Sequence, residues 1–214
     1  MMWAIRISNL FANCQSNVQT TELYCLLIIM YRAAILPSTI VQNRQTFADY
    51  VVIMGYDEHN GSSLEAGSVS SYEFVKEGIE ETIKEVPAEK VINGIPFFTR
   101  LWSETPKTQE ELNQEAGTEA ADYPMKVTSE ALGMSTARDK ISQAGAETTL
   151  DETTGNNYAT WEADGVTYEI WLEDATSIEP KLQLMKENKL AGTAAWALGQ
   201  ESPDIWDLIL KYVN

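Results

Sequence analysis

The most informative residues of this chain are a tyrosine and an aspartate, Tyr56 and Asp57, that follow a short apolar run. The run Val51-Val52-Ile53 is apolar without alternation, which is typical of a strand buried on both faces of a parallel sheet. The polar pair therefore lies at the carboxyl end of the predicted strand, where barrel enzymes place their chemistry. An aspartate at this position is also common in turns that have only a structural role.

The segments after residue 49 predict the elements that position this pair. A strand over 50–56 is followed by a Gly/Ser-rich loop and by a helix over about 71–86, which Ser70 or Ser71 caps. The helix is predicted from apolar residues at helical spacing: Val75, Ile79, Ile83 and Val86. A second apolar strand follows over 90–98. This order of elements implies two parallel strands joined by a right-handed crossover.

The middle of the chain differs in composition. Residues 103–157 are polar and long for a simple connection, and we expect one helix near 135–143 among loops. A hairpin then follows, because strands 158–161 and 166–171 flank an Asp-Gly turn.

The C-terminal segment predicts a helix, a strand and a second helix. Ser177 begins the first helix, with Glu173 and Asp174 expected to cap it, and an apolar strand covers 192–197. Ser202 with the following proline begins the last helix, whose inward residues are Ile205, Leu208, Ile209 and Tyr212.

The composition favours one domain of ordinary size and argues against a nucleic-acid partner. The net charge is −17 and the isoelectric point is about 4.3, whereas nucleic-acid phosphates require a basic face. Residues 1–46 have three arginines and one glutamate, a net charge of +2, so the remaining residues carry −19. Both cysteines lie in residues 1–46. This break predicts that residues 1–46 differ in origin or role from residues 47–214.

Residues 1–46 do not match a targeting or membrane segment. The apolar run from Leu23 to Leu36 comes late for a signal peptide, is interrupted by Arg32, and is shorter than the ~20 residues of a membrane span. We expect a buried strand, a buried helix or a poorly folding segment. Cys14 and Cys25 are too few for a disulfide framework, and they do not indicate a compartment.

Four ordered motifs resemble the C-terminal part of glycoside hydrolase family 18, in particular its bacterial spore-cortex and cell-wall glycosylases. They resemble, in order, barrel strand six, strand seven, the entry to the last helix, and strand eight. The motifs are Asp49–His59, Asn93–Arg100, Trp171–Asp174 with Ser177, Ile178 and Lys181, and Gly192–Trp196. Ala33–Ser38 resembles a remnant of strand five.

The resemblance implies an α/β fold, namely strands six to eight of a TIM (β/α)₈ barrel with a small α+β insertion over about 103–171. Strands 50–56, 91–97 and 192–197 are then expected to be parallel neighbours in that order, with helices on their outer face. The hairpin at 158–171 is expected to stand outside this sheet. The barrel is expected to be incomplete, because a full one needs about 250 residues and eight strands.

The resemblance also implies hydrolysis of β-1,4-linked N-acetylglucosamine polymers, either chitin or peptidoglycan glycan, in which the acetamido oxygen of the substrate is the nucleophile. Tyr56 would supply a hydroxyl and Asp57 would hold the sugar or its acetamido NH. Trp196 would form the apolar floor under one sugar, since pyranose CH faces pack on indole. Arg100 would hydrogen-bond a neighbouring sugar, and Met54 would also line the site.

The departures from the family pattern predict that this chain alone is inactive. The acid of the family closes an Asp-x-x-Asp-x-Asp-x-Glu motif on strand four, and no such pattern occurs in this sequence. Glu58 is the nearest substitute acid, and Phe98 stands where many members have tyrosine. The alternatives are a non-catalytic carbohydrate-binding barrel remnant and a partially folded fragment without function. The parent family implies an extracellular, cell-wall or spore location, although no clear signal peptide is present.

No cofactor or metal is expected, because His59 is the only histidine and no second ligand lies at suitable spacing. Trp102, Trp161, Trp171 and Trp206 are expected to pack or to line the cleft rim. The expected partner is an N-acetylglucosamine-containing glycan. Self-association through the open barrel edge is expected as well, because an incomplete barrel would leave apolar residues exposed, namely Val51, Ile53, Val91, Ile95 and Ala195.

Overall fold

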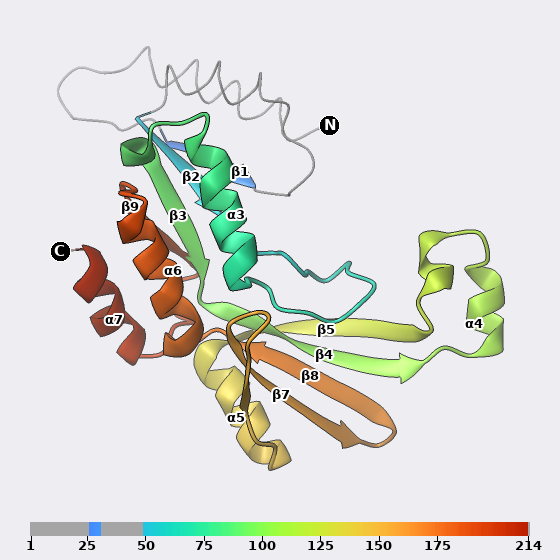
Figure 1. Cartoon of the computed structure of the whole chain (residues 1–214). Coiled ribbons are helices and arrows are strands. Elements are labelled where there is room, and N and C mark those ends of the chain that lie inside the picture. The colour runs from blue at the N-terminus through green and yellow to red at the C-terminus, as the bar shows by residue number, and fades with distance from the viewer. Residues whose placement is uncertain (1–25, 31–48, 214) are drawn as a thin grey trace.

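The computed structural model describes residues 26–30 and 49–213, which form two β-sheets with helices packed on them (Figure 1). The first sheet is parallel, with the strand order β1-β2-β3-β9 and the bounds Leu26–Met30, Tyr50–Met54, Val91–Pro96 and Gly192–Trp196. The three predicted strands β2, β3 and β9 are parallel neighbours in the expected order, so this prediction is confirmed.

The N-terminal segment contributes the fourth strand of the parallel sheet. Strand β1 pairs in parallel with β2, from Leu26 opposite Tyr50 to Met30 opposite Met54. The apolar run of this segment therefore includes a strand, which is one of the outcomes expected from the sequence. Cys14, Cys25 and the strand-five remnant at 33–38 lie outside the described residues.

Helices cover one face of the parallel sheet (Figure 1): α3 (Tyr72–Ile83), α6 (Ala175–Glu187) and α7 (Asp204–Val213). Helix α3 begins where the sequence predicts it, because the Ser71 hydroxyl accepts a hydrogen bond from the Phe74 amide at 3.3 Å. Helix α7 buries Ile205, Leu208 and Ile209 as predicted. The helices thus create the apolar layer that holds the strands in place.

The expectation that Val51, Ile53, Val91 and Ile95 are exposed is wrong. All four are at most 2% exposed, because they face α3, α6 and α7 rather than water. Ala195 is partly buried against the same layer. The error has a geometric origin: alternate residues of a strand face opposite sides, and these positions point to the helices even when the barrel is open.

The second sheet is antiparallel, with the strand order β5-β4-β8-β7-β6 (Figure 1). Its strands are β4 (Phe98–Pro106), β5 (Met125–Gly133), β6 (Thr149–Asp151), β7 (Asn156–Ala163) and β8 (Val166–Leu172). The β7–β8 hairpin is confirmed, and Asp164 and Gly165 take the positive φ angles of 54° and 76° that its turn needs. It lies outside the parallel sheet, as expected.

The polar middle of the chain is more regular than the sequence suggests. Strands β4 and β5 form a long antiparallel ribbon in a region predicted as loops around one helix. That helix is present as α5 (Met134–Ala144), and further short helices are α4 (Gln109–Gln114) and the 3₁₀ turns Ala88–Lys90 and Glu119–Asp122. The ribbon was missed because only one residue of β5 is buried, so this strand lacks the continuous apolar run that marks β2 and β3.

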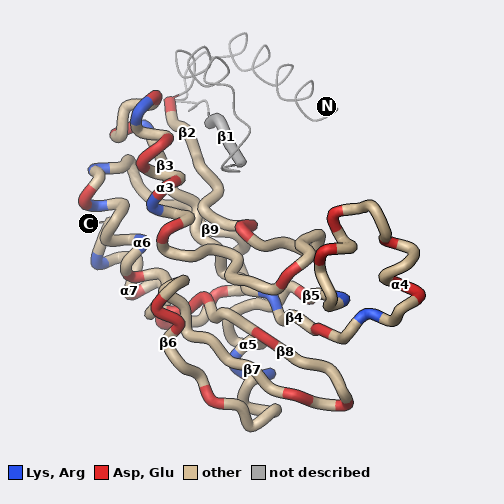
Figure 2. Tube along the Cα trace, turned by 45° about the vertical axis from the view of Figure 1, so that its right-hand side comes forward, with Lys and Arg blue, Asp and Glu red and all other residues tan. Residues whose placement is uncertain are grey.

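The N-terminus of α6 differs in part from the prediction. Asp174 is its N-cap and accepts hydrogen bonds from the amides of Thr176 and Ser177, so Ser177 lies within the first turn. Glu173 does not cap the helix, because its carboxylate is buried and bound to other groups. Acidic residues lie on the helices, in loops and on the antiparallel sheet (Figure 2), whereas the four strands of the parallel sheet have none. None of the helices in the described ranges is long and apolar enough to cross a membrane.

Candidate functional site

Tyr56 lies just beyond the carboxyl end of β2 and rests against the neighbouring strand. A Cβ atom at Gly94 would lie 3.3 Å from Cε1 of Tyr56, so the tyrosine ring occupies the space that a side chain there would need. Phe98 meets the same ring edge-on, with centroids 5.9 Å apart at 78°. Burial raises the pKa of the Tyr56 hydroxyl, and Asp57 raises it further. Tyr56 is therefore a neutral hydrogen-bond donor at ordinary pH.

Asp57 follows in a left-handed conformation, with φ of 66°. Few residues other than glycine adopt this region, although aspartate tolerates it better than most. Burial raises the pKa of the Asp57 carboxyl, whereas the Arg100 guanidinium lowers it. Asp57 and Arg100 therefore lie close enough to interact electrostatically.

Arg100 reaches this place from β4 of the second sheet. Its Nη1 donates a hydrogen bond to Ser129 Oγ on β5 at 2.9 Å, and the same nitrogen would lie 3.3 Å from a Cβ at Gly61. The buried Nε of Arg100 has no hydrogen-bond partner within the described part of the chain. Arg100 is therefore anchored at its tip, and its buried Nε–H is an unused donor.

Trp196 and Met54 lie on the face of the parallel sheet opposite the helices. The register pairs Met54 with Gly94, Gly94 with Ala194, and Pro96 with Trp196, and paired residues of parallel strands point to the same side. Two of the residues between them, Gly94 and Ala194, are small. Trp196 is 61% exposed, which leaves its indole available to a ligand.

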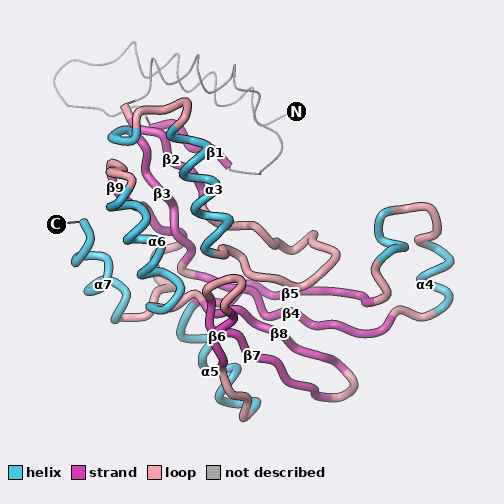
Figure 3. The backbone as a smooth tube through the Cα atoms, in the orientation of Figure 1, coloured by secondary structure: helices cyan, strands magenta, loops and turns pink. Residues whose placement is uncertain are grey.

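The loop after Asp57 is closed on itself and rests on the second sheet. The amides of Glu58 and His59 donate to the carbonyls of Val69 and Ser68, and Trp102 Nε1 donates to the Gly67 carbonyl at 2.9 Å. Figure 3 shows this loop between β2 and α3, running beside β4 and β5. The loop thereby joins the carboxyl end of β2 to the second sheet.

Two loop residues that could have chemical roles have structural ones. The Glu58 carboxylate accepts hydrogen bonds from the Ser71 amide at 2.7 Å and hydroxyl at 3.0 Å, so it holds the start of α3 rather than serving as an acid. The His59 ring packs on Gly67, and its Nδ1 lies 2.9 Å from the Ser68 carbonyl. No group of three or more potential metal ligands occurs among the residues described.

A buried polar cluster behind the site was not anticipated. Glu173 accepts hydrogen bonds from Lys181, Asn156 and Ser177, and all four residues are almost completely buried. Burial raises the pKa of the Glu173 carboxyl, and these three partners oppose the rise. One sequence signal existed: Lys181 interrupts the apolar stripe of α6 beside Ile178 and Leu182.

The other four tryptophans in the described part of the chain pack against neighbouring groups, in keeping with the sequence expectation. Trp102 is buried, Trp161 stacks on Tyr168, and Trp171 donates a hydrogen bond to Asp151 at 2.9 Å. Trp206 lies on α7, where it meets Phe97 edge-on.

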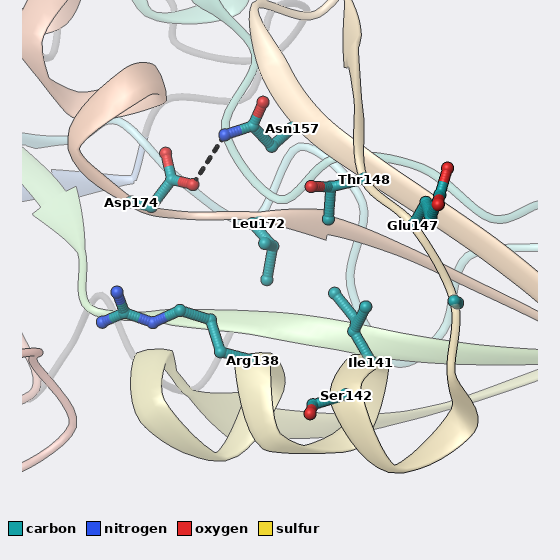
Figure 4. A pocket seen from close by; sticks show the side chains of 9 residues that line it. Arg138, Ile141, Ser142, Glu147, Thr148, Asn157, Leu172 and Asp174 are labelled. Atoms are coloured by element: carbon teal, nitrogen blue, oxygen red, sulfur yellow. Dashed lines mark hydrogen bonds between the residues drawn. The ribbon is translucent and has the colours of Figure 1, made fainter.

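A separate cavity of about 620 Å³ lies between α5 and the β7–β8 hairpin (Figure 4). Arg138 and Ile141 of α5 form one wall, and Leu172 and Asp174 form another, with Asn157 donating a hydrogen bond to Asp174 at 2.9 Å. None of the residues predicted for the site lines this cavity. The cavity is therefore distinct from the strand-end site.

Two curated relatives cover most of this chain. The uncharacterized glycosylase YvbX of Bacillus subtilis is 28% identical over 166 residues, which span 77% of this chain and 42% of the relative. The cortical fragment-lytic enzyme of the same organism is 29% identical over 168 residues, which span 78% and 35%. The chain thus spans less than half the length of these relatives.

Solved structures share the fold. The spore cortex-lytic enzyme SleL of Bacillus megaterium matches with a TM-score of 0.74 at 22% identity, over 97% of this chain and 44% of that one. A GH18 chitinase from Cycas revoluta in complex with (GlcNAc)3 matches with a TM-score of 0.65 at 25% identity, over 97% and 60%. The family model for glycosyl hydrolases family 18 matches residues 7–201, which include most of the N-terminal segment. The chain therefore belongs to glycoside hydrolase family 18.

Proposed function

We propose that this chain forms part of the glycan site of a hydrolase of β-1,4-linked N-acetylglucosamine polymers, and that the chain alone binds such a glycan without cleaving it. One observation carries the proposal: a tyrosine hydroxyl and a carboxyl stand at the end of β2, and an exposed tryptophan lies on the face of the sheet opposite the helices. The cortex-lytic relatives and the chitinase structure with (GlcNAc)3 support this substrate class.

The proposed roles follow from the chemistry of each group. The substrate's own acetamido oxygen attacks the anomeric carbon, so the protein must hold that amide in place. Tyr56, kept neutral by its raised pKa, donates its hydroxyl hydrogen bond, and Asp57 accepts one from the sugar or the acetamido NH. Trp196 packs under the pyranose ring, Arg100 donates to a neighbouring sugar, and Met54 lines the floor.

The chain lacks a proton donor for the leaving group. The family's acidic motif is absent from the sequence, and Glu58, the nearest substitute, is held by Ser71. General acid catalysis contributes roughly 10²–10⁴-fold to such reactions. Binding without turnover is therefore the expected behaviour, which is also what a non-catalytic carbohydrate-binding remnant would show.

We further infer that β2, β3 and β9 are barrel strands six, seven and eight, and that the antiparallel sheet is the insertion of a partial barrel spanning 47–214. Their parallel order supports this assignment, and β1 then takes the position next to strand six. In the described part of the chain, β1 and β9 are the edges of the parallel sheet, and unpaired edges favour association. Size-exclusion chromatography should show a self-associated chain, whereas a sharp monomer peak contradicts this inference.

The experiment measures binding and turnover on the same preparation. We expect (GlcNAc)4 to bind the intact chain in calorimetry, and Trp196→Ala to weaken that binding by roughly 3- to 10-fold, since aromatic packing is worth about 0.5–1.5 kcal/mol beyond its area. Trp206→Ala is the control, because Trp206 is also exposed but lies on α7. Chromogenic N-acetylglucosamine oligosaccharides should release no product.

Two results would overturn the proposal. Equal effects of Trp196→Ala and Trp206→Ala, or no binding at all, would remove the glycan site. Turnover that disappears in Tyr56→Phe would show that another acid has replaced the missing glutamate, and the claim of inactivity would be wrong. Two interpretations remain to be distinguished: a non-catalytic carbohydrate-binding remnant, and a part of an active enzyme. Adding the N-terminal half of a related barrel distinguishes them, because only a part of an active enzyme would then gain activity.

A further inference from the structure

Five buried polar residues from four segments form a closed ring behind the site. Lys181 Nζ of α6 donates to Ser70 Oγ at 3.0 Å, and the Ser70 amide donates to Ser68 Oγ at 3.0 Å. Ser68 Oγ donates to Asn156 Oδ1 at 2.9 Å, and Asn156 Nδ2 donates to Glu173 Oε1 at 3.0 Å. The ring closes where Lys181 meets Glu173 Oε2 at 3.0 Å. It therefore connects α6, the loop before α3, β7 and the end of β8.

Stability alone is a weak reason for this ring. All five residues are at most 1% exposed, so two full charges are removed from water. A buried ion pair contributes little net stability compared with apolar residues of the same volume, because desolvation offsets the attraction. What the ring does provide is a defined geometry, since each buried donor and acceptor is satisfied in only one arrangement.

One member of the ring also holds the backbone that precedes the site. Ser70 Oγ donates to the Gly55 carbonyl at 2.6 Å, while the Gly55 amide donates to the Gly94 carbonyl at 3.0 Å. Both polar groups of Gly55 are thus occupied, one by the ring and one by β3. Tyr56 follows Gly55 directly, so the direction of its side chain depends on this peptide.

We propose that Lys181 and Ser70 are positioning residues: Lys181 holds Ser70, and Ser70 holds the Gly55 carbonyl in the orientation that presents Tyr56 and Asp57 to a ligand. The ring thereby makes the site depend on the second sheet through Asn156 and Glu173. The ligand in question is the glycan of the proposed function, on which this part of the inference rests. The orientation of Asp57 through the Gly55 carbonyl can be tested without any ligand, from the titration midpoint of its carboxyl.

The decisive comparison is between two buried serines of the same cluster. Ser70→Ala removes the hydrogen bond to Gly55, whereas Ser177→Ala removes one to Glu173 and one accepted from the Asp174 amide without touching Gly55. Two readouts are taken: the titration midpoint of the Asp57 carboxyl by carbon-13 NMR, and the dissociation constant for (GlcNAc)4. Thermal melts establish that both variants are folded.

We expect Ser70→Ala to shift the Asp57 midpoint and to weaken (GlcNAc)4 binding by roughly 3- to 10-fold, which is the size of one net hydrogen bond. Ser177→Ala should change neither readout, even if its melting temperature falls as far as that of Ser70→Ala. Equal behaviour of the two variants in both readouts would show a merely structural ring and overturn the inference. A second pair, Lys181→Met with the exposed same-helix control Lys186→Met, applies the same test to the ammonium group.

The outcomes separate this inference from the proposed function. If the intact chain does not bind (GlcNAc)4, the proposed function fails, but the Asp57 midpoint still tests the positioning role. If binding is present and depends on Trp196 while Ser70→Ala leaves both readouts unchanged, the proposed function stands and the positioning role fails. If Lys181→Met does not fold, the serine pair alone decides.

Discussion

The two sheets of this molecule are built in different ways and contribute different groups to the site. The parallel sheet joins strands far apart in the chain, as where Ile92 pairs with Gly192, and its strands are apolar runs packed under helices. The antiparallel sheet is made largely from neighbouring segments, and its strands carry many polar, exposed residues. The first provides strand ends held by a buried apolar layer, whereas the second provides polar side chains that reach toward them, such as Arg100.

This difference explains how the site is assembled. Tyr56, Asp57 and Trp196 follow or end strands of the parallel sheet, where burial on the helix side keeps the backbone in place. Arg100 and Glu173 come from the strands and strand ends of the second sheet. A site of this kind depends on both sheets, so a substitution in one sheet should change the stability or the site residues of the other.

The largest expected effect tests whether the sheets unfold together. Ile79→Ala in the layer under the parallel sheet and Ile170→Ala in the antiparallel sheet each remove a fully buried side chain. Each should lower the free energy of unfolding by about 2–5 kcal/mol. Because the buried ring connects the two sheets, both should shift one common transition in urea, followed by circular dichroism and tryptophan fluorescence. Two separate transitions, each moved by one variant, would show that the sheets are independent.

The next effect compares two glycines of the parallel sheet. A Cβ at Gly55 would lie 2.7 Å from Asn93 Oδ1 and 2.9 Å from the Gly94 carbonyl oxygen, whereas nothing lies within 4 Å of one at Gly192. Gly55→Ala should therefore destabilise the protein by about 1–3 kcal/mol through overpacking. Gly192→Ala should stay within about 0.5 kcal/mol of the parent. Urea midpoints measure both, and similar losses would contradict the close approach at Gly55.

A smaller effect tests the electrostatic interaction between Arg100 of the second sheet and Asp57 at the end of β2. Arg100 lowers the pKa of Asp57 against the effect of burial, so Arg100→Met should raise that pKa further. A carboxyl whose pKa is raised on folding binds its proton more tightly in the folded state, so its contribution to stability falls as the pH rises through that pKa. This fall should be larger in the variant than in the parent. Carbon-13 NMR of Asp57 gives the midpoint, and an unchanged value would mean that Arg100 does not act on it; Lys76→Met on α3 is the control.

The smallest effect belongs to the far end of the antiparallel sheet. Hydrogen bonds from Lys126 and Thr108 lower the pKa of Glu111 to about 2. A lowered pKa contributes stability above the ordinary carboxyl value, and that contribution is lost as the pH falls toward 2. Lys126→Met should remove most of it, but the pair is exposed, so the change should be small and screened by salt. Urea midpoints at about pH 6 and about pH 3, with and without about 1 M NaCl, measure this change. A large change that does not depend on salt would contradict the prediction.

Much of the fold could be predicted from local sequence signals. Apolar runs identified β2, β3 and β9, serine and aspartate caps located α3 and α6 within a few residues, and the Asp-Gly turn identified the β7–β8 hairpin. The ribbon of β4 and β5 could not be predicted in this way, because β5 has only one buried residue and such a strand needs no continuous apolar run. Tyr56, Asp57, Arg100 and Trp196 were candidates only because ordered motifs resembled a known family.

By itself, the sequence determined the strands β2, β3 and β9, the longer helices and the β7–β8 hairpin, because caps, turns and side-chain periodicity act over a few residues. It also determined the family, since four motifs keep their order along the chain. Only the tertiary structure decided that Glu58 holds the start of a helix and that Lys181 reaches Ser70. These outcomes depend on groups distant in sequence that meet only after the two sheets pack, and no local pattern records which of them will meet.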